Sequence, residues 1–161
     1  MTPETLRLLN PAFLATVIGH AATGYFEHRD QEGLPLALAF IVPPLVLHKN
    51  TRTILPKIIT SKLPDWAHKN SAELAFLPEH ARELQSAVRS AILIGVHFDI
   101  LQFNDNARIC TSSQFNPETA QSQLKKSEEI GEIMKKSHFL GRWLSVSGNQ
   151  PTVLSILGIG I

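Results

Sequence analysis

Apolar residues recur every three or four positions along most of the chain and alternate in only one stretch. Residues 11–29 follow the capping pair Asn10-Pro11, carry the helical repeat and predict an amphipathic helix. A second helix is expected to begin at Pro78. Near Val96 the spacing between apolar residues falls to two positions, which is the repeat of a β-strand. The turn-forming residues Asn104-Asp105-Asn106 separate that stretch from residues 107–111, so the pattern predicts a small β-hairpin after the second helix.

The longest apolar run, residues 34–47, is interrupted by Pro35, Pro43 and Pro44. It is shorter than the roughly 20 residues that a membrane-spanning helix needs. We expect a core helix that kinks or stops early at the proline pair, because proline in a helix interior removes a hydrogen bond. The first residues lack the basic and apolar regions of an export signal.

The last long helix is predicted over residues 117–147, after the capping pair Asn116-Pro117. Its apolar stripe is narrow and is surrounded by lysine and glutamate, so this helix could pack on its own domain or bind a partner. Residues 152–161 form an almost entirely apolar tail. Such a tail should dock on its own domain or on another chain.

Helices followed by a small hairpin are the order of elements in a winged helix-turn-helix. The expected fold is therefore α+β and mostly helical, with a winged-helix-like core, a small β-hairpin and a long C-terminal helix. Residues 1–161 are enough for one domain with its own core. Within it, residues 11–115 make the winged-helix-like core, and residues 117–161 make the long helix and apolar tail, a partner-docking element.

Composition narrows the classes of partner. The net charge is +1, so no field of one sign directs the whole molecule to nucleic acid, and any basic patch must be local. A hydrophobic content of 43% is typical of a globular protein. The single cysteine, Cys110, cannot form an internal disulfide, which fits a reducing, cytoplasmic location.

The sequence carries no recognisable active-site motif. It contains no P-loop and no Gly-x-Ser-x-Gly elbow, and its seven histidines show no metal-ligand spacing with cysteine, carboxylates or each other. We therefore expect no catalytic residue, no cofactor and no metal, and interpret the protein as a non-enzyme. An enzyme would need a histidine and a carboxylate brought together from distant segments.

Two local basic features remain. Lys49, Thr51 and Arg52 could contact a phosphate or an acidic partner, although a capped helix junction is the interpretation that their residue types favour. Arg142 beside Trp143 could anchor an interface, because both residue types are enriched at binding hot spots. The favoured alternative places Trp143 in the core and Arg142 in water.

Two segments are the most distinctive, the Leu-His-Lys-x-Thr-Arg junction at residues 47–52 and Phe-Leu-Gly-Arg-Trp at residues 139–143. They occur in order with further segments, which are Asn10-Pro11-Ala12-Phe13, Gly24-Tyr25, residues 33–36, Leu55-Pro56 and residues 152–158. Together they resemble the middle component of bacterial three-component ABC systems over nearly the whole chain. One departure is the tail, which ends Gly158-Ile159-Gly160-Ile161 where the family has a Gly-Val-Arg-Pro-like end, so no contact by a tail arginine carries over.

The resemblance implies a small non-catalytic subunit of a hetero-oligomer, encoded beside an ATPase similar to SMC and Rad50 proteins and an effector that is often a nuclease. Such systems, including those called Lamassu, are similar to antiphage and antiplasmid defence modules. The subunit would bridge ATPase and effector, restrain the effector until foreign DNA is sensed, and need no membrane. The residues that we expect to contact partner proteins are Phe139, Leu140, Arg142, Trp143, Leu154, Leu157 and Ile159.

A stand-alone winged-helix DNA-binding regulator is the alternative. In that case the phosphate contacts would come from Lys49, Arg52, Lys57 and Lys62. The net charge near zero and the lack of a basic recognition helix argue against it.

Overall fold

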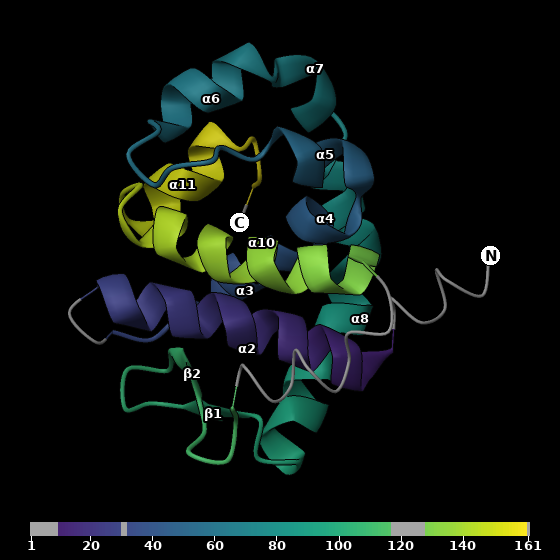
Figure 1. Ribbon diagram of the computed structural model, residues 1–161, viewed down its shortest axis with the longest axis vertical. Coiled ribbons are helices and arrows are strands. Elements are labelled where there is room, and N and C mark those ends of the chain that lie inside the picture. Colours follow the sequence, from purple (N-terminus) through teal and green to yellow (C-terminus); the bar gives the residue numbers. More distant parts are fainter. Residues whose placement is uncertain (1–9, 30–31, 117–127, 161) are drawn as a thin grey trace.

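Two long helices packed side by side form the centre of the protein (Figure 1). The computed structural model describes residues 10–29, 32–116 and 128–160. The central helices are α2 (Pro11–His28) and α10 (Glu128–Ser145). Every residue of α2 from Phe13 to Ala22 is buried, so this helix is covered on all sides and not only on one apolar face.

The start of α2 follows the capping pattern of the sequence. The side-chain oxygen of Asn10 accepts hydrogen bonds from the backbone N–H groups of Ala12 and Phe13, at 2.9 and 3.3 Å. Pro11 occupies the first turn, where a missing N–H costs no hydrogen bond. The helix predicted over residues 11–29 is confirmed.

The apolar run breaks before its proline pair and not at it. It forms two short helices, α3 (Leu36–Ala39) and α4 (Val42–Leu47), and the prolines occupy the first turn of α4. The expected kink or stop at these prolines is therefore wrong, because a helix start needs no partner for its first N–H groups. A third short helix, α5 (Lys49–Ile54), follows at once.

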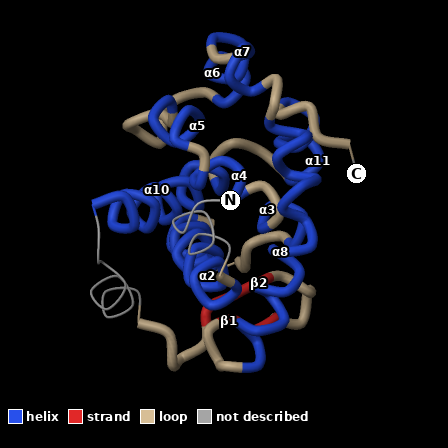
Figure 2. Tube along the Cα trace, turned by 90° about the vertical axis from the view of Figure 1, so that its right-hand side faces the viewer, coloured by secondary structure: helices blue, strands red, loops and turns tan. Residues whose placement is uncertain are grey.

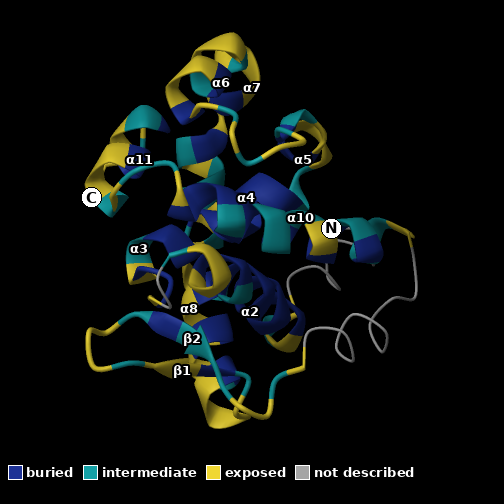
Figure 3. Cartoon of the chain, turned by 60° about the vertical axis from the view of Figure 1, so that its left-hand side comes forward, coloured by how far each residue is buried: buried dark blue, intermediate teal, exposed yellow. Residues whose placement is uncertain are grey.

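Further helices in the described part of the chain complete the fold. They are α6 (Leu63–Lys69), α7 (Ser71–Leu74), α8 (Leu77–His97) and α11 (Gln150–Ile156). Helices α6 and α7 lie at one end of the molecule, and α8 runs along it towards the hairpin at the other end (Figures 1 and 2). Exposed residues are concentrated at these two ends, whereas α2 is mostly buried (Figure 3).

The hairpin consists of β1 (Leu101–Phe103) and β2 (Ile109–Thr111), paired antiparallel. The Asn104 side chain closes its turn by accepting hydrogen bonds from the N–H groups of Asn106 and Arg108, at 2.9 and 3.0 Å. The first strand begins later than the alternation near Val96 suggested, because α8 continues to His97. The expected class, mostly helical with a small hairpin and a C-terminal helix, is confirmed, but the winged-helix-like arrangement is not.

Helix α10 packs on its own domain. It lies along α2, and its buried residues include Ile133, Leu140 and Leu144. The part of the predicted long helix that covers residues 117–127 lies outside the described residues. After α10 the chain turns at Gly148, where φ is +119°, and enters α11, which packs on α3 and α6.

Candidate functional site

The junction between α4 and α5 is held together by the residues that could have bound phosphate. The hydroxyl of Thr51 lies within hydrogen-bond distance of the carbonyl oxygens of Leu45 (2.9 Å), His48 (3.0 Å) and Pro44 (3.3 Å). Thr51 is buried, whereas Lys49 is exposed. The threonine therefore links α5 to the end of α4, but it is not the N-cap of α5, because that position is His48, which makes no side-chain capping bond.

Arg52 is buried, with 1% of its surface exposed. One guanidinium nitrogen, Nη1, donates to the carbonyl oxygens of Val46 and Leu47, at 2.8 and 3.3 Å. The other, Nη2, donates to the Glu129 carboxylate at 3.3 Å. Its Nε lies 3.4 Å from Glu132 without the alignment of a hydrogen bond, so that contact is an ion pair. The guanidinium thus joins the end of α4 to α10, and of Lys49, Thr51 and Arg52 only Lys49 has an exposed side chain.

The segment Phe139–Trp143 points largely into the core. Trp143 is fully buried, and its indole N–H donates to the Ser61 carbonyl oxygen at 2.7 Å. Its ring meets that of Trp66 edge-on, with centroids 5.1 Å apart. Leu140 is also fully buried, whereas Phe139 and Arg142 are half-buried. Partner contact by this segment remains a prediction, and in the folded chain its accessible members are Phe139 and Arg142.

The apolar tail docks on its own chain. Leu154 and Leu157 are buried, and Ile159 is half-buried. The Ile159 N–H donates to the Leu154 carbonyl oxygen at 2.9 Å, which folds the tail back on α11. Partner contact by Leu154, Leu157 and Ile159 also remains a prediction.

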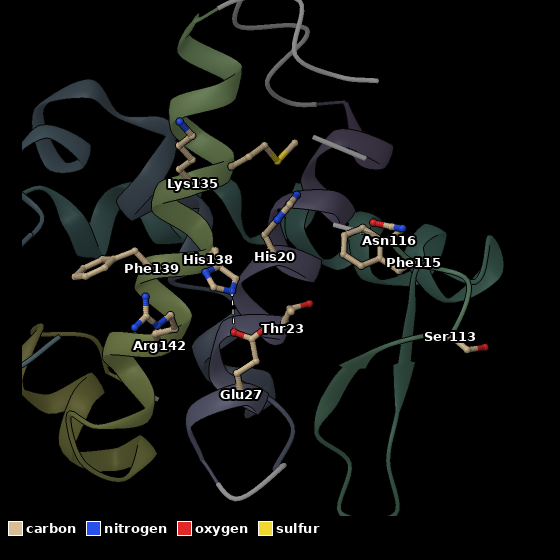
Figure 4. A pocket seen from close by; sticks show the side chains of 11 residues that line it. His20, Thr23, Glu27, Ser113, Phe115, Asn116, Lys135, His138, Phe139 and Arg142 are labelled. Atoms are coloured by element: carbon tan, nitrogen blue, oxygen red, sulfur yellow. Dashed lines mark hydrogen bonds and ion pairs between the residues drawn. The ribbon is translucent and has the colours of Figure 1, made fainter. Parts of the chain in front are cut away.

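A cleft of about 870 Å³ opens between α2, α10 and the segment after β2 (Figure 4). Its polar lining includes His20 and Glu27 from α2 and Lys135, His138 and Arg142 from α10. His138 Nε2 lies 3.1 Å from a Glu27 carboxylate oxygen, an interaction that crosses between the two helices.

His20 lies deepest among the titratable residues of this cleft. Its Nε2 is buried, and no hydrogen bond joins it to the part of the chain that the structure describes. The ring of Phe115 meets it edge-on at 5.7 Å. Burial, and then the proximity of His138, lowers the pKa of His20 from 6.5 to about 4, so the imidazole is neutral at pH 7.

The lining residues form no catalytic set within the described part of the chain. The hydroxyl of Thr23 donates to the Gly19 carbonyl oxygen at 2.9 Å, and no hydrogen bond links His20 or His138 to a hydroxyl or thiol there. Groups of three or more histidine, cysteine or acidic residues that could hold a metal do not occur among residues 10–29, 32–116 and 128–160. Over the same residues, no helix is long and apolar enough to span a membrane.

The family comparison agrees with the resemblance that was based on the distinctive segments of the sequence. The family model for the ABC-three component (ABC-3C) system Middle Component 3 matches residues 1–161. The chain belongs to this family. No curated protein and no solved structure matches the chain. Membership implies that this middle component works with other components of a three-component ABC system.

Sequence reasoning on this middle component missed the cleft, because its residues come from segments more than a hundred positions apart, as His138 and Glu27 are. One side of the cleft could have been predicted from the sequence. Lys135, His138 and Arg142 are spaced three and four apart, which places three basic groups on one face of α10. The stacked rings of His48 and His80, with centroids 3.7 Å apart, were also missed, because these two residues belong to different segments of the chain, 32 positions apart.

Proposed function

We propose that this middle component is a non-catalytic bridging subunit of an antiphage or antiplasmid defence complex. It links an SMC/Rad50-like ATPase to a nuclease effector and keeps the effector inactive until foreign DNA is sensed. Family membership supports a place among several subunits. The distribution of exposed apolar side chains supports the bridging role.

Apolar side chains are exposed at both ends of α8. At its start, 60% of the Phe76 surface is exposed. At its other end lies a group that we call the lower apolar surface, which consists of Leu93, Val96, Phe98 and Phe103. Helix α8 has 21 residues, and at about 1.5 Å per residue it holds these two places roughly 30 Å apart. One exposed phenylalanine at the start of α8 and the lower apolar surface at its other end give separate contact points for two different partners.

Reconstitution with the neighbouring components tests this function. The chain is co-expressed with the ATPase and effector encoded beside it, and a tag on the ATPase is used for purification. We expect the effector to co-purify only when the middle component is present. The bridging role would be refuted if the effector co-purified with the ATPase without the middle component. It would also be refuted if the effector failed to co-purify when the middle component was present.

Matched surface variants make the test specific. Phe76→Ser and Leu93→Ser each remove one exposed apolar side chain from opposite ends of α8, and neither residue is part of the buried core. Each variant is expected to weaken binding to a different partner. If both weaken the same contact, the two ends do not serve two partners. Tight, salt-dependent binding of duplex DNA by the isolated chain would instead support the DNA-binding regulator.

A further inference from the structure

The lining of the cleft between α2 and α10 carries more positive than negative charge. Two cations, Lys135 and Arg142, line it together with one carboxylate, that of Glu27. The Glu27 carboxylate already faces His138, whose Nε2 lies 3.1 Å away. The two cations of α10 are therefore not balanced by the acidic group of the lining.

Neither cation has an acidic partner within the part of the chain that the structure describes. Lys135 is exposed and makes no hydrogen bond or ion pair there. The Arg142 side chain approaches only a histidine, with Nη2 3.5 Å from His28 Nε2, and its buried Nε has no hydrogen-bond partner among the described residues. Arg52 differs, since its guanidinium faces two glutamates of α10. The half-buried Arg142 is left with donors that an anion could satisfy.

The basic side chains share one face of α10. Lys135, His138 and Arg142 are three and four positions apart, and all three border the cleft. At about 1.5 Å per residue, Lys135 and Arg142 lie roughly 10 Å apart along the helix axis, with His138 between them. The flexible lysine side chain can therefore turn towards an anion that lies beside His138 and Arg142.

The shape and the other walls of the cleft suit a small molecule. The half-buried rings of Phe115, from the segment after β2, and Phe139, from α10, stand on opposite sides of it (Figure 4). The volume of about 870 Å³ falls within the roughly 300–1,000 Å³ of small-molecule sites. His20, with 3% of its surface exposed, forms the base. A concave site with aromatic walls and a few basic groups selects a ligand that is both anionic and partly apolar.

We propose that this cleft binds a small organic anion, a phosphate or carboxylate that carries an aromatic or apolar group. Arg142 and His138 hold the anionic group, Lys135 closes over it, and the apolar part lies against Phe115. The anion supplies the acidic partner that the described part of the chain does not give to either cation. None of the lining residues belongs to α8, so this site is separate from the contact points of the proposed bridging function and does not depend on it.

Binding of phenyl phosphate and of benzoate to the purified full chain tests the proposal. Each probe joins a ring to an anionic group, and the pair distinguishes a phosphate ligand from a carboxylate ligand. Inorganic phosphate and benzyl alcohol are the controls, because each has only one of the two parts. We expect at least one probe to bind with a Kd of about 1 mM or lower and to shift the NMR signals of the His138 ring, and both controls to bind roughly tenfold more weakly.

Two neighbouring lysines provide a matched pair of variants. Lys135→Gln and Lys136→Gln each remove one positive charge from α10, but of these two lysines only Lys135 lines the cleft. Lys135→Gln should weaken probe binding roughly fivefold or more, and Lys136→Gln should weaken it less than about twofold. Arg142→Gln should weaken it at least as much as Lys135→Gln does. Thermal unfolding checks that all three variants remain folded.

Three results would overturn the proposal. The first is that neither probe binds at millimolar concentration. The second is equal weakening by the two lysine variants, because binding would then reflect the general charge of α10. The third is that inorganic phosphate binds as tightly as phenyl phosphate, which would show an adventitious ion only. Each of these results leaves the co-purification of effector and ATPase unaffected, so failure of this site and failure of the bridging function are distinguishable.

Discussion

Gly141 of α10 lies directly against the backbone carbonyl of Ala21 in α2, where a Cβ atom would overlap the carbonyl oxygen. Gly24 of α2 has the same relationship with the carbonyl oxygen of His138. The two central helices therefore approach each other through one glycine from each. This contact gives a structural reason for the glycine in the Phe-Leu-Gly-Arg-Trp segment.

Gly141→Ala should destabilise the protein. Alanine is the better helix former by about 1 kcal/mol, which taken alone would stabilise α10. The added methyl group meets backbone atoms of α2, which cannot rotate away, so the helices must separate. We expect the free energy of unfolding in urea to fall by about 1–3 kcal/mol.

Gly160→Ala is the control for this experiment, because a Cβ atom there meets nothing within 4 Å. Its unfolding free energy should stay within about 0.5 kcal/mol of the wild type. An unchanged or higher stability of Gly141→Ala would contradict the close helix contact.

Arg52 is expected to stabilise the fold more than either of its acidic partners does. Arg52→Leu leaves the carbonyl oxygens of Val46 and Leu47 without their donor, and we expect a loss of about 2–4 kcal/mol. Glu129→Gln should cost less than about 1 kcal/mol, because 42% of the glutamate side chain is exposed to water. Chemical denaturation measures both changes. Equal costs for the two variants would mean that the ion pair, and not the carbonyl contacts, dominates.

Much of the fold could be predicted from interactions between residues that lie close together in the sequence. The Asn10 cap and the Asn104 turn were readable because each acts on residues within four positions. The proline pair was misread, since the sequence alone did not show that α3 would end before it. The winged-helix-like arrangement was inferred from element order, and order alone does not fix how helices pack.

The candidate site was less predictable because its side chains interact across long sequence separations. Arg52 looks like a surface cation in the sequence, but it meets Glu129, which lies 77 positions later. Trp143 likewise donates to a carbonyl 82 positions away. A core position for Trp143 was favoured from the sequence, but only the packing of α10 onto the rest of the fold shows that Arg52 faces inward.

Trp143→Phe distinguishes a core role from an interface role. Phenylalanine is smaller and lacks the indole N–H, so the Ser61 carbonyl loses its donor and a gap opens beside Trp66. We expect the unfolding free energy of the isolated chain to fall by about 1–3 kcal/mol. Phe139→Ala is the comparison variant, because the Phe139 ring stacks beside Trp143 but is only half-buried. Full stability of Trp143→Phe combined with lost partner binding would contradict the core role.

The neutral state of His20 predicts that stability falls in acid. In the folded chain the pKa of His20 is lowered to about 4, whereas an unfolded histidine titrates near 6.5. Between these pH values the unfolded state binds a proton that the folded state does not. The contribution of the neutral His20 ring to the unfolding free energy is therefore fully present above about pH 6.5 and decreases as the pH falls towards 4. From pH 7.5 to pH 5, this one group should lower the unfolding free energy by about 2 kcal/mol.

The comparison with His20→Gln isolates this contribution. Glutamine is polar but does not titrate, so the variant should lose less stability between pH 7.5 and pH 5 than the wild type does. Burial, and then the proximity of His80, also lowers the pKa of His48, but this histidine is present in both proteins and cancels in the difference. Urea denaturation at the two pH values provides the free energies, and the NMR titration of the His20 ring provides its midpoint. A midpoint near 6.5 would show that the imidazole is solvated, and the cleft beside His138 would then be open to water at its base.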